Sequence, residues 1–526
     1  MLSPTVSIQQ AEPPLALTLD VGTSSVRALL FDRLGRAVEG VFASGATTLR
    51  APEPGAVEIQ PGELLETCLT GLDAALDQAS RLARQIAAVG VSTLASNVLG
   101  VDEDGQAITP IYTYADSRPA PDVAALRAQF DEAEIHRRTG CRFHPSYLPA
   151  RFLWLKRTRP ELLQRAKRWM SFGEYLLLRL FGRTAVSASI ASWSGLLERQ
   201  RLTWDEALLA GLPLRAEQLS PLAQEGQAFT GLSGAFAARW PALLQASWHP
   251  AVADGAAANV GAGCTSPERL ALTIGTTSAL RLMMAEPAGS PDPARLVRRA
   301  KEVGADPLHD VPWGLWCYRA DRRRSLLGGA LTEGGNLFDW MTRSLNLADA
   351  PDMERALAEI PPDSHGLTIL PFLAGERSPG WAGDARGAIH GLTLNTEPLH
   401  IVRAGLEAVA LRLSLVYSLL GEAGSRVQQV IAGGGAARRS PVWLQIIADA
   451  IGRPVVASPV GEPSGRGAAL MALEAAGEIS DLDAAPDFPG TAYAPDEQNH
   501  RLYRQALERQ GRLYTALVGT REGAWP

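Results

Sequence analysis

The sequence predicts a mixed α/β protein of two similar domains with a cleft between them. At 526 residues the chain is long enough for two or three domains. Apolar stretches of strand length alternate along it with amphipathic stretches of helix length. One unit, two apolar strands joined by a Gly-Thr turn, occurs once in each half, at residues 15–31 and 269–284. Such repetition indicates duplicated domains, and the cleft between them is a common place for a ligand.

The elements of the first half follow from periodicity and from turn residues. Residues 1–14 end at Pro13-Pro14 and predict a short disordered tail. We expect strands at 15–20, 26–31, 37–44 and 87–92, and helices at 62–85, 121–138, 150–159 and 172–181. This half is assigned to a domain at residues 15–253.

The second half begins with its own strand pair and ends in helices. We expect strands at 269–274, 279–284, 427–431 and 455–457, and helices at 398–420, from Gly435 to 451, at 467–476 and at 496–518. The second domain is therefore assigned to residues 254–480, and a C-terminal helical extension to 481–526. Arg322-Arg323-Arg324 is expected to be a solvated turn rather than an anion site.

Composition excludes several functional classes. A net charge of −6 and a pI near 5.9 disfavour a nucleic-acid binder and a polybasic membrane anchor. The three lysines, Lys156, Lys167 and Lys301, lie outside any G-K-[ST] motif, so a P-loop is absent. The four cysteines are far apart, no apolar run reaches 18 residues, and the N-terminus lacks a basic leader. These features predict a cytoplasmic protein without a membrane span.

Three glycine-containing segments are candidate phosphate-binding sites. Gly22, Thr23 and Ser24 form the first turn, and Gly275 and Thr276 the second. Glycine lets the backbone approach a phosphoryl group, while N–H groups and hydroxyls donate hydrogen bonds to it. The third segment, Gly433-Gly434-Gly435, lies between a strand and a helix, where a nucleotide is often bound. Each taken alone is also compatible with an ordinary tight turn.

Two aspartates are candidates for the chemistry. Asp20 ends a strand and could hold Mg²⁺ through water. Asp254 ends an apolar stretch at the presumed hinge, where a carboxylate can accept a proton from an attacking hydroxyl. A helix N-cap is the alternative for Asp254, because small residues follow it. Asp116 and Arg118 also follow a strand, either as substrate ligands or as a surface ion pair.

Together these residues resemble the FGGY carbohydrate kinases of the actin-like ATPase superfamily. The resemblance covers about residues 15–480 and rests on the order and spacing of several motifs. They are D-V-G-T-S-S-V-R-A-L-L-F-D from Asp20, L-T-I-G-T-T-S-A from Leu272, L-P-F-L-A-G-E-R-S-P from Leu370, G-A-I-H-G-L-T-L-N from Gly387, and I-A-G-G-G-A-A-R-R-S-P from Ile431.

The resemblance implies two actin-like (ribonuclease-H-like) domains with an interdomain cleft, the sugar on the first and Mg·ATP mainly on the second. Asp254 would be the catalytic base, and Asp20 and Asp254 would lie at the metal. The phosphate turns and the glycines Gly329, Gly434 and Gly435 would bind ATP. Asp116 and Arg118 would bind the substrate, although Tyr114 replaces the usual Trp of that motif.

Within the family the sequence looks most like the gluconokinases, through segments at 139–146, 189–197, 254–261, 317–319 and 328–336. Xylulokinases usually carry Asp-Asn at the base, where this chain has Asp254-Gly255, and Ala95-Ser96 replace a Met-His pair of many members. A sugar acid, D-gluconate, is the predicted substrate, because Arg118, Arg142 and His144 could bind a carboxylate.

Two alternatives remain at this stage. One is a xylulokinase-like or other polyol kinase of the same family. The other is a non-catalytic, nucleotide-gated binding protein of the actin-like superfamily, for which a substrate segment would be superfluous. The expected partners are a small sugar or sugar acid and ATP, with no nucleic acid and no membrane. A homodimer is compatible with the sequence but is not determined by it.

Overall fold

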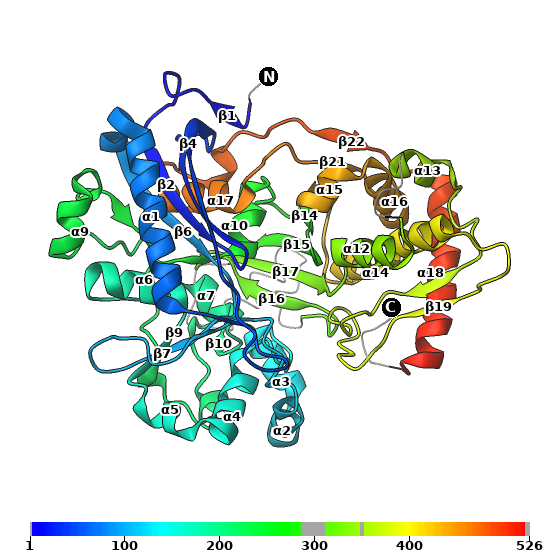
Figure 1. The fold of residues 1–526 in the computed structure, drawn as a ribbon, viewed down its shortest axis with the longest axis horizontal. Helices are drawn as coiled ribbons and strands as arrows, with labels where there is room; N and C mark the ends of the chain where they lie inside the picture. The colour runs from blue at the N-terminus through cyan, green and yellow to red at the C-terminus, as the bar shows by residue number, and fades with distance from the viewer. Residues whose placement is uncertain (1–2, 287–310, 348–351, 521–526) are drawn as a thin grey trace, which may run out of the picture.

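The computed structural model describes residues 3–286, 311–347 and 352–520 and consists of two lobes, each built on a seven-stranded sheet (Figure 1). The strands of the first sheet are β1 (Thr5–Val6), β4 (Ala37–Ala46), β3 (Ser25–Phe31), β2 (Leu15–Val21), β6 (Ile86–Thr93), β12 (Ser247–Trp248) and β13 (Val252–Ala253). Those of the second are β16 (Trp316–Arg319), β17 (Arg324–Leu331), β15 (Ser278–Ala285), β14 (Arg269–Ile274), β20 (Gln429–Gly433), β21 (Val455–Ala457) and β22 (Thr491–Tyr493).

The two sheets share one internal strand order. In the first, β4, β3 and β2 are antiparallel neighbours, and β6 and β12 then continue in parallel. In the second, β17, β15 and β14 are antiparallel, and β20 and β21 continue in parallel. The Gly-Thr turns occupy the same position in both, between the two central antiparallel strands. This repeated order confirms the predicted pair of α/β domains.

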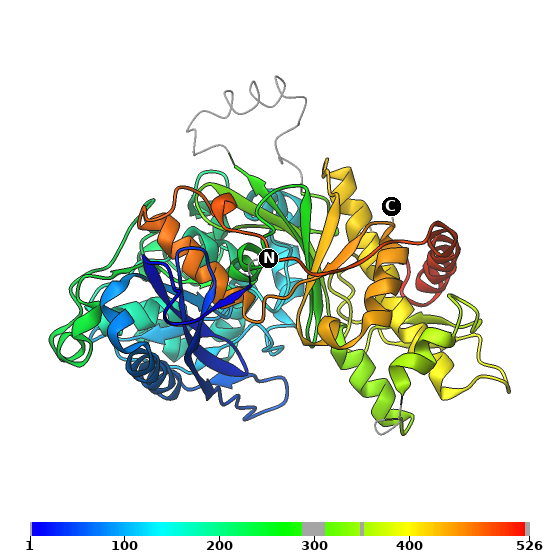
Figure 2. The same cartoon turned by 90° about the horizontal axis from the view of Figure 1, so that it is seen from above.

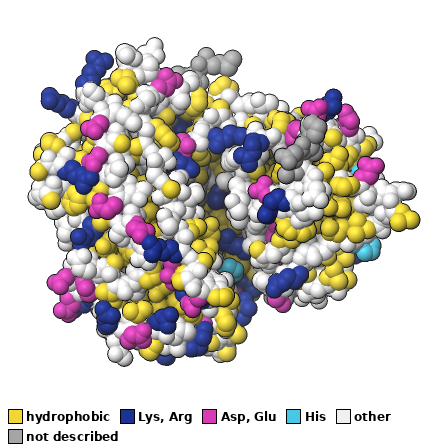
Figure 3. All heavy atoms as spheres, in the orientation of Figure 1, with side chains coloured by type: hydrophobic (Ala, Val, Ile, Leu, Met, Phe, Trp, Pro, Cys, Tyr) yellow, Lys and Arg dark blue, Asp and Glu magenta, His cyan; other side chains and the backbone are white. Residues whose placement is uncertain are grey.

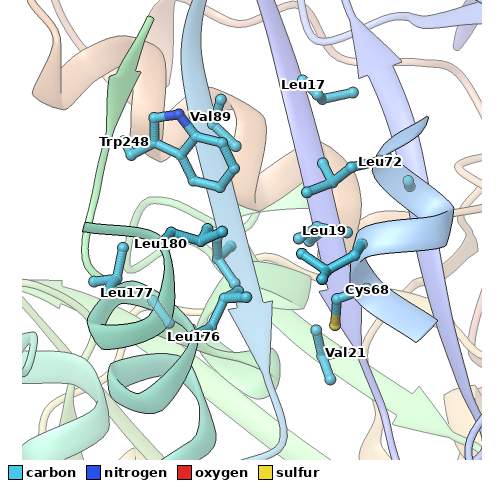
Figure 4. Packing of buried hydrophobic residues seen from close by; sticks show 14 of the residues in the cluster. Leu17, Leu19, Val21, Cys68, Leu72, Val89, Leu176, Leu177, Leu180 and Trp248 are labelled. Atoms are coloured by element: carbon cyan, nitrogen blue, oxygen red, sulfur yellow. The ribbon is translucent and has the colours of Figure 1, made fainter. Parts of the chain in front are cut away.

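The alternation of side chains along β2 and β6 explains how the first sheet is covered. Leu17, Leu19, Val21 and Val89 face α1 (Pro61–Ala79) and α6 (Phe172–Phe181), as Figure 4 shows. Ala16 and Ala88 point to the other face, where α17 (Pro463–Ala475) packs. Because successive side chains of a strand point to opposite faces, each strand contributes to both layers.

A helix from the end of the chain therefore lies on the first sheet. Figure 2 shows α17 (orange) against the blue strands of the first lobe, although it follows the second sheet in sequence. It crosses α10 (Asp254–Gly261), and both helices contribute to a cluster that includes Met283 and Trp316 of the second sheet. The outer face of the second sheet is covered by α14 (Pro398–Glu422) and α16 (Pro441–Ile451).

Glycines allow the crossing of α10 and α17. A Cβ on Gly467 would overlap the carbonyl oxygen of Ala257, and one on Gly261 would overlap that of Pro463. On the sheet side, a Cβ on Gly90 would overlap the carbonyl oxygen of Ala468. Backbone thus packs directly on backbone, and no side chain separates the helices.

The remaining elements complete the two lobes. Helices are α2 (Asp122–Gln129), α3 (Glu132–Thr139), α4 (Leu148–Thr158), α5 (Pro160–Arg165), α7 (Ala188–Trp193), α8 (Glu206–Leu209), α9 (Gly234–Arg239), α12 (Gly335–Ser344), α13 (Met353–Glu359), α15 (Gly435–Arg439) and α18 (Glu497–Leu517). Short strand pairs are β5 (Glu58–Ile59) with β8 (Ile111–Tyr112), β7 (Leu99–Val101) with β9 (Arg168–Met170), β10 (Leu197–Glu198) with β11 (Thr203–Trp204), and β18 (Thr368–Leu370) with β19 (Ala388–His390).

Two predictions about the N-terminus and the turns are wrong. Residues 3–14 are not a disordered tail, since β1 pairs with β4 and Glu12 forms ion pairs with Arg33 and Arg36. The turn at 322–324 is not simply solvated: Arg324 is 9% exposed and paired with Glu474.

The helix predicted near the C-terminus is present as α18. It packs on α16, and β22 pairs with β21, so this part of the chain belongs to the second lobe.

Two predicted helices are interrupted. Asp131 separates α2 from α3 and caps α3, its side chain accepting hydrogen bonds from Ala133 and Glu134. Ser440 separates α15 from α16 and caps α16 in the same way. Serine and aspartate favour such N-caps because their side chains satisfy otherwise unpaired backbone N–H groups.

One helix of the described residues, α14, is long and apolar enough to cross a membrane by length and composition. In its most apolar window, 83% of the residues are buried inside the protein. It contributes Val409, Leu413 and Val416 to the core of the second lobe, so burial in that core accounts for its composition.

We predict that Gly467→Ala lowers the free energy of unfolding by about 3 kcal/mol or more, because the new methyl group must separate α10 from α17. Gly421→Ala is the matched control: Gly421 is also helical, but a Cβ there would meet nothing within 4 Å. This control is expected to be neutral or to stabilise by up to about 1 kcal/mol. Urea denaturation measures both, and equal effects would contradict the packing argument.

Candidate functional site

In each Gly-Thr turn the glycine N–H is hydrogen-bonded within the turn, although the first turn is one residue longer. The Gly22 N–H donates to the Ser25 carbonyl at 2.9 Å, and the Gly275 N–H donates to the Thr277 carbonyl at 3.0 Å. Ser24, Thr276 and Thr277 are exposed at the tips. Each turn therefore satisfies its glycine N–H internally and offers hydroxyl groups outward, which suits an anionic ligand.

Other glycines meet at the second turn. The Gly335 N–H donates to the Gly275 carbonyl at 2.8 Å, and a Cβ on Gly334 would lie 2.7 Å from the Thr277 carbonyl carbon. Gly434 has a φ of +97°, and a Cβ there would overlap the Ile274 carbonyl oxygen. The structure thus brings the Gly275 turn and the Gly434-Gly435 turn together. Gly334 and Gly335 extend this surface at the start of α12.

Gly329 lies elsewhere. It is within β17, and a Cβ on it would lie 2.7 Å from Val416 of α14 and 3.0 Å from Ser378. Close packing of the sheet beneath α14 is sufficient to explain this glycine. The structure does not bring it to the surface formed by the glycine turns.

Asp20 and Asp254 lie close enough for their charges to interact. Asp20 lies in β2, and burial together with the charge of Asp254 raises its pKa to about 6, while Arg27, at 3.6 Å, opposes the shift. Burial also raises the pKa of Asp254, and Arg281 lowers it. Two carboxylates that destabilise each other's charged forms fit a site completed by a divalent cation.

Asp254 is the first residue of α10 and not its N-cap. The N-cap position belongs to Ala253, and the Oδ1 atom of Asp254 accepts a hydrogen bond from the Gly255 N–H at 2.8 Å. The helix N-terminus stabilises the carboxylate through its partial positive charge, and the second carboxylate oxygen is left for other partners.

Asp254 also lines a pocket of about 150 Å³ between the lobes. Figure 3 shows a groove between the lobes, with Lys and Arg side chains along it. We call this space the cleft pocket. Its side-chain lining comes from Ala95, Ser96, Tyr114, Ser146, Tyr147, Trp193 and Asp254 on the side of the first sheet, and from Thr277, Ala279, Arg281, Trp316, Tyr318, Ala330 and Arg377 on the side of the second.

Aromatic rings join the two sides of the cleft pocket. Trp193 stacks on Tyr318 with ring centroids 4.0 Å apart, and Tyr318 stacks on Trp316 at 4.3 Å. The hydroxyl of Tyr147 is hydrogen-bonded to that of Tyr318. These rings provide flat apolar walls, against which the C–H faces of a sugar or polyol can pack.

Two arginines in the cleft pocket have no ion-pair partner within 4 Å in the described part of the chain. Arg281 donates to the Thr273 hydroxyl at 2.9 Å, but its Nε atom is buried without a partner. The Nε atom of Arg377 is likewise buried and unpaired, although its guanidinium contacts the Tyr147 hydroxyl. A half-buried guanidinium with an unsatisfied N–H group and no ion-pair partner is costly, so both sites favour an anionic ligand.

The predicted substrate residues do not line this pocket. Asp116 and Arg118 form a buried ion pair at 2.5 Å, and Glu53 and Glu58 add two more carboxylates to Arg118. This favours the ion-pair alternative of the sequence analysis, in a buried form.

Arg142 and His144 are also occupied. Arg142 contacts Glu132 at 3.3 Å and lies 3.7 Å above the ring of Trp313. Burial lowers the pKa of His144 to about 3, so its ring is neutral at pH 7, and it packs on Trp381. The same segment does reach the cleft pocket through Ser146 and Tyr147.

Arg281 and Arg377 were not among the site residues predicted from the sequence. Arg281 is a single charged residue in the apolar strand Ser278–Ala285, and that anomaly was a usable signal. Arg377 lies inside the segment at 370–379 that carried the resemblance.

Comparison with known proteins decides the family. Residues 15–261 match the N-terminal domain of the FGGY family of carbohydrate kinases, and residues 270–476 match its C-terminal domain. The chain belongs to the FGGY family of carbohydrate kinases. Members are phosphotransferases that act on sugar alcohol groups with ATP as phosphate donor. The non-catalytic alternative is therefore not supported.

Individual relatives differ in substrate. The chain is 28% identical to a gluconokinase of Bacillus subtilis over 510 residues, covering 93% of this chain and 94% of that one. It is 30% identical to a glycerol kinase of Leptothrix cholodnii over 485 residues, covering 89% and 92%. The crystal structure of a gluconate kinase from Lactobacillus acidophilus superposes with a TM-score of 0.83 at 26% identity, covering 96% and 99%. These similarities confirm the family and the fold.

We predict that Asp20→Asn stabilises the ligand-free protein at pH 7. Since the pKa of Asp20 is about 6 in the folded protein and near 4 when unfolded, the charged carboxylate destabilises the fold above pH 6. Removing it should raise the free energy of unfolding by on the order of 2 kcal/mol at pH 7. The gain should shrink as the pH falls from about 6 to 4, because the native carboxyl is then protonated.

Urea titrations at pH 4.5, 6 and 7.5 measure this effect, with Asp77→Asn on the exposed side of α1 as the control. A gain that is constant over this pH range would show that Asp20 does not titrate as described.

Proposed function

We propose that this protein transfers the γ-phosphoryl group of Mg·ATP to the terminal hydroxyl of a sugar acid, and that the substrate is D-gluconate. The similarity to gluconokinases supports this proposal, but glycerol kinases are similarly close in sequence. The observation that carries it is the location of Arg281 and Arg377 in the same pocket as Asp254.

The charges in the cleft pocket favour an acid over a neutral sugar. Guanidinium groups bind carboxylates bidentately and more strongly than they bind hydroxyls. Arg281 and Arg377 lack carboxylate partners among the described residues, whereas Arg118 has three. Asp254 is the one carboxylate among the described lining residues, and its charge already interacts with Arg281, so two arginines share one carboxylate. A sugar acid would supply a second negative charge, whereas a neutral sugar would not. We therefore move the proposed carboxylate site from Arg118, Arg142 and His144 to Arg281 and Arg377.

Gly255 supports the same assignment. A Cβ at this position would lie 2.8 Å from the Trp193 ring and 3.3 Å from the Nε atom of Arg281. Any larger residue beside the base would displace one of them. The absence of a side chain at 255 thus leaves the space that Trp193 and the Arg281 guanidinium occupy.

The catalytic steps follow from the positions of the carboxylates and turns. Asp254 accepts the proton of the substrate hydroxyl, and the raised pKa of a buried carboxylate makes it a better base. The hydroxyl oxygen then attacks the γ-phosphorus in line. Thr23, Ser24 and Thr276 donate hydrogen bonds to the phosphoryl oxygens as charge develops on them.

Mg²⁺ fits the paired carboxylates at this position, because Asp20 and Asp254 each raise the cost of the other's negative charge. When bound, it would neutralise charge on the phosphates. Asp20 would hold it through water and Asp254 would lie beside it. The glycines at 275, 334, 335, 434 and 435 would line the nucleotide side. A cytoplasmic location and a homodimer are proposed from the sequence alone.

We predict that Asp254→Asn slows turnover by roughly 10²–10⁴-fold with little change in ATP binding, since it removes the general base and keeps the side-chain shape. Steady-state ADP release measures turnover, and thermal unfolding with and without Mg·ATP measures folding and nucleotide binding. A folded variant that keeps more than about a third of wild-type turnover would show that another group is the base.

We predict that D-gluconate has a higher kcat/KM than D-xylulose, L-ribulose or glycerol under identical Mg·ATP conditions. Arg281→Met and Arg377→Met should each lower kcat/KM for gluconate by about 10- to 100-fold, as expected for a lost charged hydrogen bond. Their effect on the neutral substrates should be much smaller, because no carboxylate is lost from those complexes.

Arg118→Ala and Arg142→Ala are the controls for this assignment. They should lower stability without changing the ratio of gluconate to xylulose kcat/KM. If a neutral sugar is preferred by tenfold or more, the sugar-acid proposal fails and the kinase assignment stands. If gluconate is preferred but both Met variants keep the wild-type ratio, its carboxylate binds elsewhere.

A further inference from the structure

A second cavity, of about 130 Å³, lies where the two lobes meet and shares no lining residue with the cleft pocket. We call it the junction cavity. Its walls are β6 at Gly90 and Val91, the loop at 223–227, the segment at 249–252, the turn at 320–323 between β16 and β17, and α17 from Ala468 to Ala475. Both sheets and the crossing helix α17 therefore border it.

Most of the lining is small and apolar. It includes Ala188, Ala223, Val252, Ala320, Met471 and Ala472. An engineered apolar cavity of about 150 Å³ is known to hold benzene, so this one can hold the ring of a small aromatic molecule. Exposed Ala475 lies at its edge, where the rest of a ligand can extend to solvent.

Two of the polar side chains in the lining, His249 and Arg322, indicate what else a ligand needs. The Nδ1 atom of His249 is 3.3 Å from the Gln227 carbonyl, which can only accept, so Nδ1 carries the proton. The Nε2 atom is then an acceptor, and it is buried with no partner in the described segments. A ligand that donates a hydrogen bond to it removes the cost of an unsatisfied buried group.

Arg322 supplies the charge. Its guanidinium donates to the Ala223 carbonyl at 3.2 Å and has no acidic side chain within 4 Å in the described ranges. Its neighbours pair with the acidic groups of the lining. Arg323 and Arg324 both contact Glu474, at 2.8 and 2.6 Å. Arg323 also contacts Glu225 at 3.5 Å, and Arg324 contacts Asp321 at 2.7 Å. Of the three consecutive arginines, Arg322 is thus the one available to an anion.

Three elements connect the junction cavity to the cleft pocket. Helix α7 starts at Ala188 in the cavity and ends at Trp193 in the pocket. Strand β16 starts at Trp316 in the pocket and leads to Ala320 in the cavity. Val252 of β13 lines the cavity two residues before Asp254. A ligand in the cavity therefore contacts the elements that position the aromatic stack and the base.

We propose that the junction cavity is a regulatory site for a small aromatic carboxylate that carries a hydrogen-bond donor. The carboxylate pairs with Arg322, the ring fills the alanine-lined space, and the donor binds Nε2 of His249. Because the ligand bridges both lobes, its binding changes the kinetic constants of the phosphotransfer reaction. The site does not depend on which sugar the enzyme phosphorylates.

Binding is tested by calorimetric titration of the full chain with 3- and 4-hydroxybenzoate, with benzoate and phenol as partial ligands. One hydroxybenzoate should bind saturably, at least fivefold more tightly than benzoate or phenol. Arg322→Ala and His249→Phe should each weaken it tenfold or more, and Ala475→Trp should abolish it by filling the edge of the cavity. Glu478→Trp, at an exposed position outside the lining, is the matched control and should bind normally.

Regulation is tested with the same probe at saturation, using whichever sugar or polyol the enzyme phosphorylates best. The kcat or KM should change at least twofold in the wild type and in Glu478→Trp, and should not change in Ala475→Trp. Linkage requires that the sugar shift the hydroxybenzoate Kd by the same factor as the probe shifts the sugar Kd.

Three results would overturn the proposal. The first is the absence of saturable hydroxybenzoate binding up to 10 mM, which is about the weakest relevant affinity. The second is binding that persists in Ala475→Trp. The third is binding that leaves kcat and KM unchanged. Each is independent of the gluconate assignment, because binding is measured without a sugar and the kinetic assay uses the best substrate found.

Discussion

The crossing of α10 and α17 without intervening side chains is the constraint on which the rest of the structure depends. Gly467 of α17 packs on the backbone of α10, and Gly90 of β6 packs on the backbone of α17. Since interiors are close-packed, even one added methyl group would move a helix against a sheet. The crossing fixes α10 between the two lobes, and its first residue, Asp254, is thereby held at the mouth of the cleft.

The same contact joins the two lobes. Helix α17 belongs to the second half of the chain but covers the inner face of the first sheet. Leu470 and Met471 on this helix also join a cluster with residues of β16 and β17. If one sheet moves relative to the other, the packing of α17 and α10 must therefore change. Both cavities between the lobes are bordered by this pair or by the elements next to it.

Charge is concentrated at the cleft at a cost to stability. Asp20 is buried and close enough to Asp254 for their charges to interact, and the half-buried Arg281 and Arg377 have no ion-pair partner within 4 Å in the described chain. Such groups are unfavourable in the free protein and become favourable when a ligand supplies the missing counter-charge. By contrast, the cluster of Arg118 with three carboxylates is complete in itself. This contrast separates residues that stabilise the fold from residues that await a ligand.

Local sequence was sufficient to predict much of the fold. Several elements were predicted with nearly their observed bounds, namely the strands at 269–274 and 455–457 and the helix at 398–422. Apolar periodicity and flanking glycines and prolines act over a few residues, so they can be recognised in the sequence alone. The pairing of two Gly-Thr turns likewise predicted duplicated domains. The ordered N-terminal segment was missed, since Thr5–Val6 becomes a strand only by pairing with Ala37–Val38 of β4.

Part of the candidate site could likewise be predicted from the sequence, and part could not. Sequence alone identified Asp20, Asp254 and the glycine turns, because each motif is contiguous and its chemistry is carried by adjacent residues. It could not assign the cations. Arg118 looked available to a substrate until Glu53 and Glu58, some 60 residues earlier, were seen to surround it. Arg281 and Arg377 are nearly 100 residues apart, and only the fold brings them beside Asp254. Whether a charge is paired depends on contacts distant in sequence, so only the tertiary structure decided which arginines lack an ion-pair partner in the described chain.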